Sequence, residues 1–374
     1  MSFAPPTPAR TAGLTAIALL AFAGNSLLCR IALRDTAIDA ASFTSVRLVS
    51  GALMLALLVA WRGRGRAGAP TEAPTDAQVG TQAGTQAGAQ TGALRPWHAG
   101  DWTSALALFV YAAGFSFAYV SLSAATGALL LFGMVQTSMI GWGLWRGERL
   151  RPLQWAGLAA ASAGLVWLLL PGLATPSLAA GLLMASAGIA WAVYTLRGRV
   201  AGPKVGSQAG SPAGDATAVT AGNFLRAAPM ALALSLVLNA LGWAPARWDS
   251  AGLLLALASG ALASGLGYAV WYTALRGLTA TRAAILQLTV PALATAGGVG
   301  LLGEPVTPSL LGASAAVLGG VLLVILARPA ARPADPPALL PADLPADPPP
   351  HQPPHQPLNQ PLNQTAPPAA APGR

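Results

Sequence analysis

The sequence has few charged residues. Only 9% of its 374 residues are Asp, Glu, Lys or Arg, whereas 54% are hydrophobic. A soluble domain carries about 25% charged residues, because its surface must be solvated. The composition therefore excludes a soluble globular protein. It predicts an all-α integral membrane protein, since apolar runs of about 20 residues cross a bilayer as helices.

Groups for catalysis, cross-linking and metal binding are also scarce. The single cysteine, Cys29, lies in the first apolar run, which excludes an internal disulfide. The three histidines, His98, His351 and His355, lie outside the apolar runs. No Gly-x-Ser-x-Gly or His-Glu-x-x-His motif occurs. We therefore expect no enzyme activity, no cofactor and no metal site.

Acidic residues are missing from the apolar runs. All twelve lie in loops, in tails or at the ends of runs. Carriers that exchange a solute for protons usually hold a carboxylate within the membrane. The sequence therefore argues against proton antiport through an intramembrane carboxylate, and it favours a facilitator or an exchanger.

The net charge of +9 does not indicate a nucleic-acid partner, because the basic residues lie in short loops between apolar runs. With the N-terminus in the cytoplasm, fifteen Lys and Arg fall on the inner side. Three, Arg30, Arg34 and Arg247, fall in outer loops. Positive loops remain inside. The pattern predicts a multi-pass protein of the bacterial inner (plasma) membrane, surrounded by lipid, with both termini cytoplasmic.

Ten apolar runs are long enough to be predicted as membrane spans. They are 13–33, 41–61, 103–121, 125–145, 154–170, 178–196, 219–241, 251–275, 283–302 and 308–327. Three other segments are rich in Gly, Ala, Ser, Gln or Pro and cannot bury a core. We predict a disordered loop at 67–100, a flexible loop at 201–216 and a disordered cytoplasmic tail at 328–374. Residues 1–12 form the cytoplasmic N-terminus.

The second half of the chain repeats the first. Gly114–Leu122 returns as Gly267–Leu275, and Gly147-Glu148 returns as Gly303-Glu304, at offsets of 153 and 156 residues. Each copy holds five predicted spans, so the second copy enters the membrane from the opposite side. Inverted repeats of this kind are typical of transporters that work by alternating access.

The residues of the second copy resemble the EamA family of the drug/metabolite transporter superfamily. The similar stretch is Trp271–Leu286, which continues through Pro291 to Gly303-Glu304-Pro305. Arg47 and the Gly24-Asn25-Ser26 break in the first span look similar too. The first copy departs from the family pattern at two positions: Ala23 stands where a Trp is common, and Val135 where a Pro is common.

The resemblance covers about residues 11–327. It implies two inverted five-helix EamA repeats, at 13–171 and 172–327. It also implies a secondary transporter of small metabolites, an exporter of amino acids or related compounds, as a monomer or a homodimer. A channel and a non-transporting membrane scaffold remain as alternatives.

Two arginines, Arg47 and Arg226, lie in corresponding spans of the two copies, the second and the seventh. An arginine within the membrane usually faces a cavity or a partner. We interpret the pair as anion-attracting gate residues. The alternative is that both side chains extend from a helix end to the membrane surface.

Aromatic and amide side chains complete the predicted solute pathway. Spacings of four residues place aromatic rings on one face of the third and eighth spans. On the eighth span, Gly260 and Ser264 precede the rings at the same spacing and lie on the same face. Buried amides need polar partners in lipid. The further pathway candidates are Asn25, Tyr111, Phe115, Tyr119, Gln136, Trp191, Tyr194, Tyr268, Trp271, Tyr272, Gln287 and Pro291, the last as a kink in the ninth span. Glu148 and Glu304 are predicted helix-end anchors or gate contacts.

Overall fold

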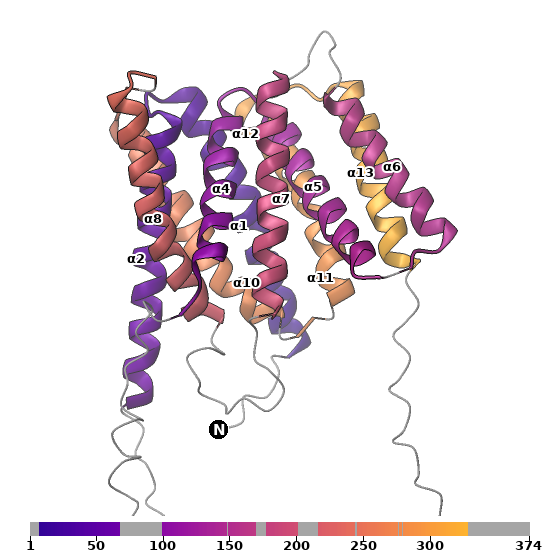
Figure 1. Ribbon diagram of the computed structural model, residues 1–374, viewed down its shortest axis with the longest axis horizontal. Coiled ribbons are helices and arrows are strands. Elements are labelled where there is room, and N and C mark those ends of the chain that lie inside the picture. Colours follow the sequence, from indigo (N-terminus) through magenta and orange to yellow (C-terminus); the bar gives the residue numbers. More distant parts are fainter. Residues whose placement is uncertain are drawn as a thin grey trace, which may run out of the picture. The chain divides into compact units, whose positions relative to one another are not determined.

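The computed structural model describes residues 7–67, 99–147, 149–169, 177–200, 216–243, 245–275, 277–278 and 280–327, and within these residues it is helical and has no strand (Figure 1). Nine of the described helical segments are long and apolar enough to cross a membrane. The protein is therefore an all-α membrane protein. The nine segments match every predicted span except 154–170. Glu148, the tail 328–374 and all but the ends of the two predicted loops lie outside the described residues.

The helices follow one another with short connections where the chain is described. In the first half they are α1 (Pro8–Asp35), α2 (Ala40–Ala67), α4 (Trp102–Tyr119), α5 (Ala124–Trp145) and α6 (Pro152–Leu169). In the second half they are α7 (Leu178–Val200), α8 (Ala216–Ala240), α9 (Ser250–Leu257), the π-helix η3 (Ala258–Leu266), α10 (Gly267–Leu275), α11 (Ala280–Gln287), α12 (Thr289–Leu302) and α13 (Pro308–Leu326).

Side-chain caps fix where several helices begin. Asp101, Ser123 and Thr307 accept hydrogen bonds from the backbone N–H groups of Ser104, Thr126 and Leu310, at the starts of α4, α5 and α13. Such a side chain satisfies an N–H group that has no partner within the helix. These polar residues therefore mark the ends of the apolar runs.

Helix α1 is longer than the sequence predicted at both ends. It begins at Pro8, because Thr7 caps it and proline suits the first turn. It ends at Asp35, so Arg30 and Arg34 lie in its last turns rather than in an outer loop, and their assignment to that loop was wrong. Cations are favourable at a helix C-terminus, which carries partial negative charge.

The eighth and ninth predicted spans are not continuous α-helices. The eighth passes through π-helix η3 between α9 and α10. The ninth is interrupted at Leu288, three residues before Pro291. Proline has no N–H group, so the carbonyl of Gln287 loses its helical partner. The helix is therefore interrupted in this span, N-terminal to the proline. The kink at Pro291 itself stays a prediction.

Small residues allow the closest helix contacts. Helices α6 and α13 lie side by side (Figure 1), and a Cβ atom added to Gly157 would lie 2.6 Å from the carbonyl oxygen of Gly320. Such faces let two backbones approach closely in lipid. Further along the same pair, Gly164 of α6 packs against Ala316 and Val317 of α13. These contacts, and the hydrogen bond from Nε2 of Gln154 to the carbonyl oxygen of Val324, hold α6 against α13.

Candidate functional site

A small cavity lies inside the bundle, between helices from both halves of the chain. Its volume is about 20 Å³, which is room for about one water molecule. Its lining comes from α1, α4, α5, α7, η3, α10 and α11. The lining residues are Phe22, Asn25, Ser26, Tyr111, Phe115, Leu131, Phe132, Trp191, Ala263, Ser264, Tyr268 and Gln287.

Aromatic rings form much of the cavity wall, and Trp191 is central among them. Its ring centroid lies 4.7 Å from that of Tyr111, 5.2 Å from that of Tyr268 and 5.4 Å from that of Tyr194. Tyr268 also contacts Phe22, at 5.9 Å. Aromatic pairs at these separations stabilise one another beyond their buried area. The wall is thus a connected set of rings that offers π faces and hydroxyl groups to a solute.

Arg47 lies directly behind this wall. Its side chain is only 1% exposed. Nη2 donates to the hydroxyl of Tyr111 at 3.0 Å, and Nε donates to Oγ of Ser264 at 3.3 Å. The guanidinium carbon lies 4.7 Å from the ring centroid of Phe115. Arg47 is therefore buried among cavity residues, and the alternative that it extends to the membrane surface was wrong.

The π-helix η3 brings its backbone unusually close to α2. A Cβ atom on Gly260 would clash with Oγ of Ser50 and with the carbonyl oxygen of Arg47. On the other side of η3, Ser259 donates to the amide oxygen of Asn25 at 2.6 Å. π-helical turns occur frequently at functional sites. Here the turn places Ala263, Ser264 and Tyr268 in the cavity wall, next to Arg47.

Six of the predicted pathway residues line the cavity, and they are Asn25, Tyr111, Phe115, Trp191, Tyr268 and Gln287. The others do not. Tyr119, Tyr194, Gln136, Trp271 and Pro291 are buried outside its lining, and Tyr272 is half-buried. The sequence pattern did not single out the lining residues Phe22, Leu131, Phe132 and Ala263. Apolar residues in a membrane span carry no signal that separates a cavity wall from ordinary packing.

Arg226 lies away from the cavity, near the start of α4. Its Nη1 donates to the carbonyl oxygens of Ala99 and Gly222, at 2.6 and 2.9 Å. The guanidinium carbon lies 5.8 Å from the ring centroid of Trp102. Arg226 therefore fastens α8 to the segment that precedes α4, and the structure does not bring it together with Arg47.

The same end of α4 carries an ion pair. Nη2 of Arg197 lies 2.9 Å from Oδ1 of Asp101. Partial burial acts to raise the pKa of Asp101, but the hydrogen bonds from Ser104 and the charge of Arg197 outweigh it and hold the pKa below its usual value. Oδ1 of Asn223 in α8 accepts a hydrogen bond from the backbone N–H of Asp101 at 2.9 Å. Helices α4, α7 and α8 are thus tied together here.

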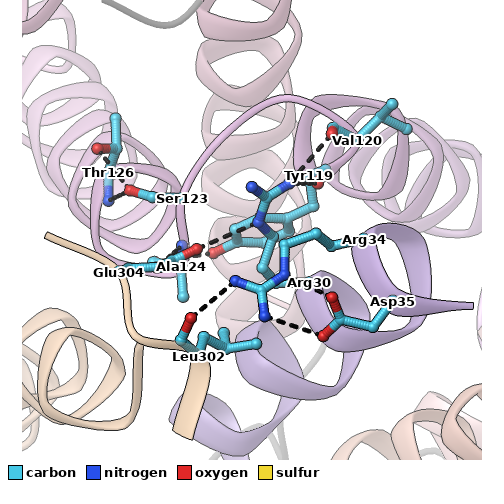
Figure 2. Close-up of polar contacts among 10 residues, drawn as sticks. All are labelled: Arg30, Arg34, Asp35, Tyr119, Val120, Ser123, Ala124, Thr126, Leu302 and Glu304. Atoms are coloured by element: carbon cyan, nitrogen blue, oxygen red, sulfur yellow. Dashed lines mark hydrogen bonds and ion pairs between the residues drawn. The ribbon is translucent and has the colours of Figure 1, made fainter. Parts of the chain in front are cut away.

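A second polar network lies at the opposite end of α4 and is centred on Glu304 (Figure 2). Nε of Arg30 donates to Oε1 of Glu304 at 3.2 Å, and the backbone N–H of Ala124 donates to Oε2 at 2.8 Å. Nη1 of Arg30 also donates to the carbonyl oxygens of Tyr119 and Val120, both at 3.0 Å. The network joins the ends of α1 and α4, the start of α5 and the segment after α12.

The Gly-Glu motif has a structural reason. Gly303 has a φ of +62°, a left-handed conformation in which glycine is favoured. Its N–H donates to the carbonyl of Val299, and the N–H of Glu304 donates to that of Gly298. This is a helix-ending motif that requires a residue such as glycine after the last turn. It turns the chain so that Glu304 reaches Arg30.

Comparisons with known proteins identify the family of the chain. Residues 178–326 match the model of the EamA-like transporter family. A protein of Pseudomonas aeruginosa (strain PAO1), called Uncharacterized protein PA1977, is 50% identical over 319 residues, which is 85% of this chain and 96% of the relative. The chain belongs to the EamA-like transporter family. The resemblance inferred from Trp271–Glu304 is therefore confirmed.

A solved crystal structure supports the fold of this EamA-like transporter. It covers 87% of this chain and 100% of its own, with a TM-score of 0.52 and 19% sequence identity. At this identity the likeness concerns the fold alone. Family membership makes the protein a membrane transporter of the drug/metabolite type. The cavity between its two halves is the candidate site for the transported solute.

Proposed function

We propose that this EamA-like protein is a secondary transporter that moves small metabolites, amino acids or related compounds, across the inner membrane by alternating access, in the direction of export. The central cavity is the solute site. The proposal rests mainly on which spans supply the residues that line the cavity. Its residues come from the first and sixth, the third and eighth, and the fourth and ninth predicted spans, which are three pairs of corresponding elements in the two copies.

The helix contacts support two inverted five-helix repeats at 13–171 and 172–327. If the two copies are related by symmetry, replacing each helix by its counterpart in the other copy should turn one observed helix contact into another observed contact. The contact of α4 with α7 corresponds to that of α10 with α1, and the contact of α5 with α7 to that of α12 with α1. Two further pairs, α2 with α8 and α6 with α13, correspond to themselves. This pattern is expected for a pseudo-two-fold axis in the membrane plane. The proposed topology has ten spans and both termini in the cytoplasm.

The two polar networks lie at opposite ends of α4, with the cavity between them. The network of Arg30 and Glu304 ties α1, α4 and α5 together at one end. At the other end, Arg226 and the pair of Arg197 with Asp101 tie α4, α7 and α8 together. In our proposal each network closes one entrance, and transport requires them to open in turn. The small volume of the cavity fits a closed, solute-free state.

Counterflow in proteoliposomes tests the proposal. Vesicles that contain the full-length protein are loaded with an unlabelled compound and placed in a trace of the same labelled compound, without an ion gradient. The panel consists of amino acids, small carboxylates and small amines. Transient accumulation of a labelled compound would establish a carrier. Equilibration without accumulation would indicate a channel, and no movement of any compound in the panel would count against transport.

A further inference from the structure

We propose that the cavity recognises its solute through a carboxylate group, that Arg47 supplies the opposite charge, and that the aromatic wall holds an apolar or aromatic body attached to that group. This inference names the substrate class of the proposed transporter, and it rests on the proposed function. It follows from the charge of the site, the position of Arg47 and the chemistry of the cavity wall.

The charge of Arg47 lacks an ionic partner within the described part of the chain. Its observed partners are the hydroxyls of Tyr111 and Ser264, which are neutral. Its Nη1 atom is buried and makes no hydrogen bond to any described residue. No ion pair of the described residues includes it. A buried, unpaired charge is costly, and an arriving anion would remove that cost.

The guanidinium is positioned to meet a solute in the cavity. Tyr111, Phe115 and Ser264 each line the cavity and also contact Arg47. Tyr111 and Ser264 thus lie both against Arg47 and against the cavity, and in our proposal a solute displaces them to reach the guanidinium. Arginine presents a planar fork of N–H groups that matches a carboxylate in two-point hydrogen bonding.

The remainder of the cavity wall suits an uncharged body. None of the twelve lining residues is acidic, so a solute that carries only an ammonium group finds no carboxylate there. Phe22, Phe115, Phe132 and Trp191 offer apolar surface, and Gln287 offers an amide. Apolar pockets with a few placed polar groups bind amphipathic ligands. A carboxylate joined to an aromatic or aliphatic body therefore fits the wall better than an amine does.

A purely structural Arg47 is the competing explanation, because its hydrogen bonds also join α2 to α4 and η3. Such a role predicts that replacing Arg47 lowers stability without changing which solutes bind. Discrimination between matched ligands separates the two roles.

The test measures binding of four compounds of similar shape to the purified full chain by isothermal titration calorimetry. They are 3-phenylpropionate, its amide, 3-phenylpropylamine and L-phenylalanine. The variants are Arg47→Gln and Arg47→Lys. Arg62→Gln is the matched control, since Arg62 is on the same helix, α2, but donates to Oγ1 of Thr217, outside the cavity wall. Size-exclusion chromatography and thermal unfolding establish that each variant is folded.

We expect 3-phenylpropionate to bind the wild-type protein at least about tenfold more tightly than its amide or the amine, in line with the strength of charged hydrogen bonds. Arg47→Gln abolishes this preference, Arg47→Lys retains part of it, and Arg62→Gln leaves it unchanged. Comparable binding of L-phenylalanine would assign the site to amino acids, and its absence would assign it to simple carboxylates.

Three results would overturn the inference: equal or tighter binding of the amide or the amine, a preference that persists in Arg47→Gln, or no binding of either carboxylate compound. The proposed transport function fails separately. Carboxylate binding without counterflow would count against transport alone, whereas counterflow of amines that is independent of Arg47 would support transport and refute the carboxylate site.

Discussion

Arg30 and Glu304, which are separated by 274 residues in the sequence, form an ion pair of 3.2 Å between the end of α1 and the segment after α12 (Figure 2). Their side chains are only 14% and 7% exposed. Each makes additional hydrogen bonds to the backbone of the α4–α5 region. A buried pair that makes further hydrogen bonds couples distant parts of the chain, and the loss of either partner leaves a buried charge.

We therefore predict that Arg30→Gln and Glu304→Gln each lower the free energy of unfolding by about 3 kcal/mol, the usual cost of breaking a buried ion pair. The double variant should lose clearly less than the two single losses combined, because neither charge is then stranded. Thermal or denaturant unfolding in detergent measures this.

The exposed pair of Arg34 with Asp35 provides the control. Its side chains are 33% and 43% exposed, and surface pairs contribute little. Asp35→Asn should therefore change the free energy of unfolding by less than about 1 kcal/mol. Strict additivity of Arg30→Gln and Glu304→Gln would show that the pair does not couple α1 to the segment after α12.

Gly260 tests the close approach of η3 to α2. In Gly260→Ala the new methyl group clashes with Oγ of Ser50 and with the backbone of Arg47. Overpacking of this kind costs about 1–3 kcal/mol, and the displaced Arg47 should also weaken solute binding. Gly300→Ala is the matched control in α12, where an added Cβ meets nothing within 4 Å. It should be neutral or slightly stabilising. Equal effects of the two changes on unfolding would contradict the packing described.

Trp191 tests the aromatic wall. Trp191→Ala removes the ring that contacts Tyr111, Tyr194 and Tyr268, and we expect solute affinity to fall at least tenfold, since large rings carry much of a site's binding energy. Trp142→Ala removes an exposed indole that contacts Trp145 instead. Transport kinetics should show a raised KM for the first variant and wild-type kinetics for the second. Wild-type kinetics in Trp191→Ala would exclude the cavity as the solute site.

Asp101, which caps the start of α4, should make the stability of the protein depend on pH. The pKa of this carboxyl is lowered in the folded protein, so its stabilising contribution is present above the usual pKa of about 4. It is lost as the pH falls through the lower, folded-state pKa. The stability difference between wild type and Asp101→Ala should therefore shrink below about pH 4. A difference that grows on acidification would contradict the assignment.

The scaffold and part of the cavity could be predicted from the sequence, because spans, caps and the Gly-Glu motif each have a local signal. The four-residue spacing of Tyr111 and Phe115, and the aromatic residue Tyr268 in the second copy, predicted part of the cavity wall. The burial of Arg47 and the π-helix at Ala258–Leu266 had no such signal. Both depend on Gly260 meeting α2, a contact that forms only when helices distant in sequence pack together.

The central claim is that the cavity opens alternately to the two sides of the membrane. Cys29 is the only cysteine in the chain, so Cys29→Ser gives a background free of thiols. In that background, Ala263→Cys places one thiol in the cavity wall. Ala313→Cys, at a fully buried position in α13, is the negative control. Oriented vesicles are then treated with a membrane-impermeant maleimide from either side.

We predict that Cys at position 263 is labelled from both sides, that a bound solute slows both reactions, and that Cys at position 313 is labelled from neither. Labelling of position 263 from one side only, or from neither side while the denatured protein reacts fully, would contradict alternating access through this cavity.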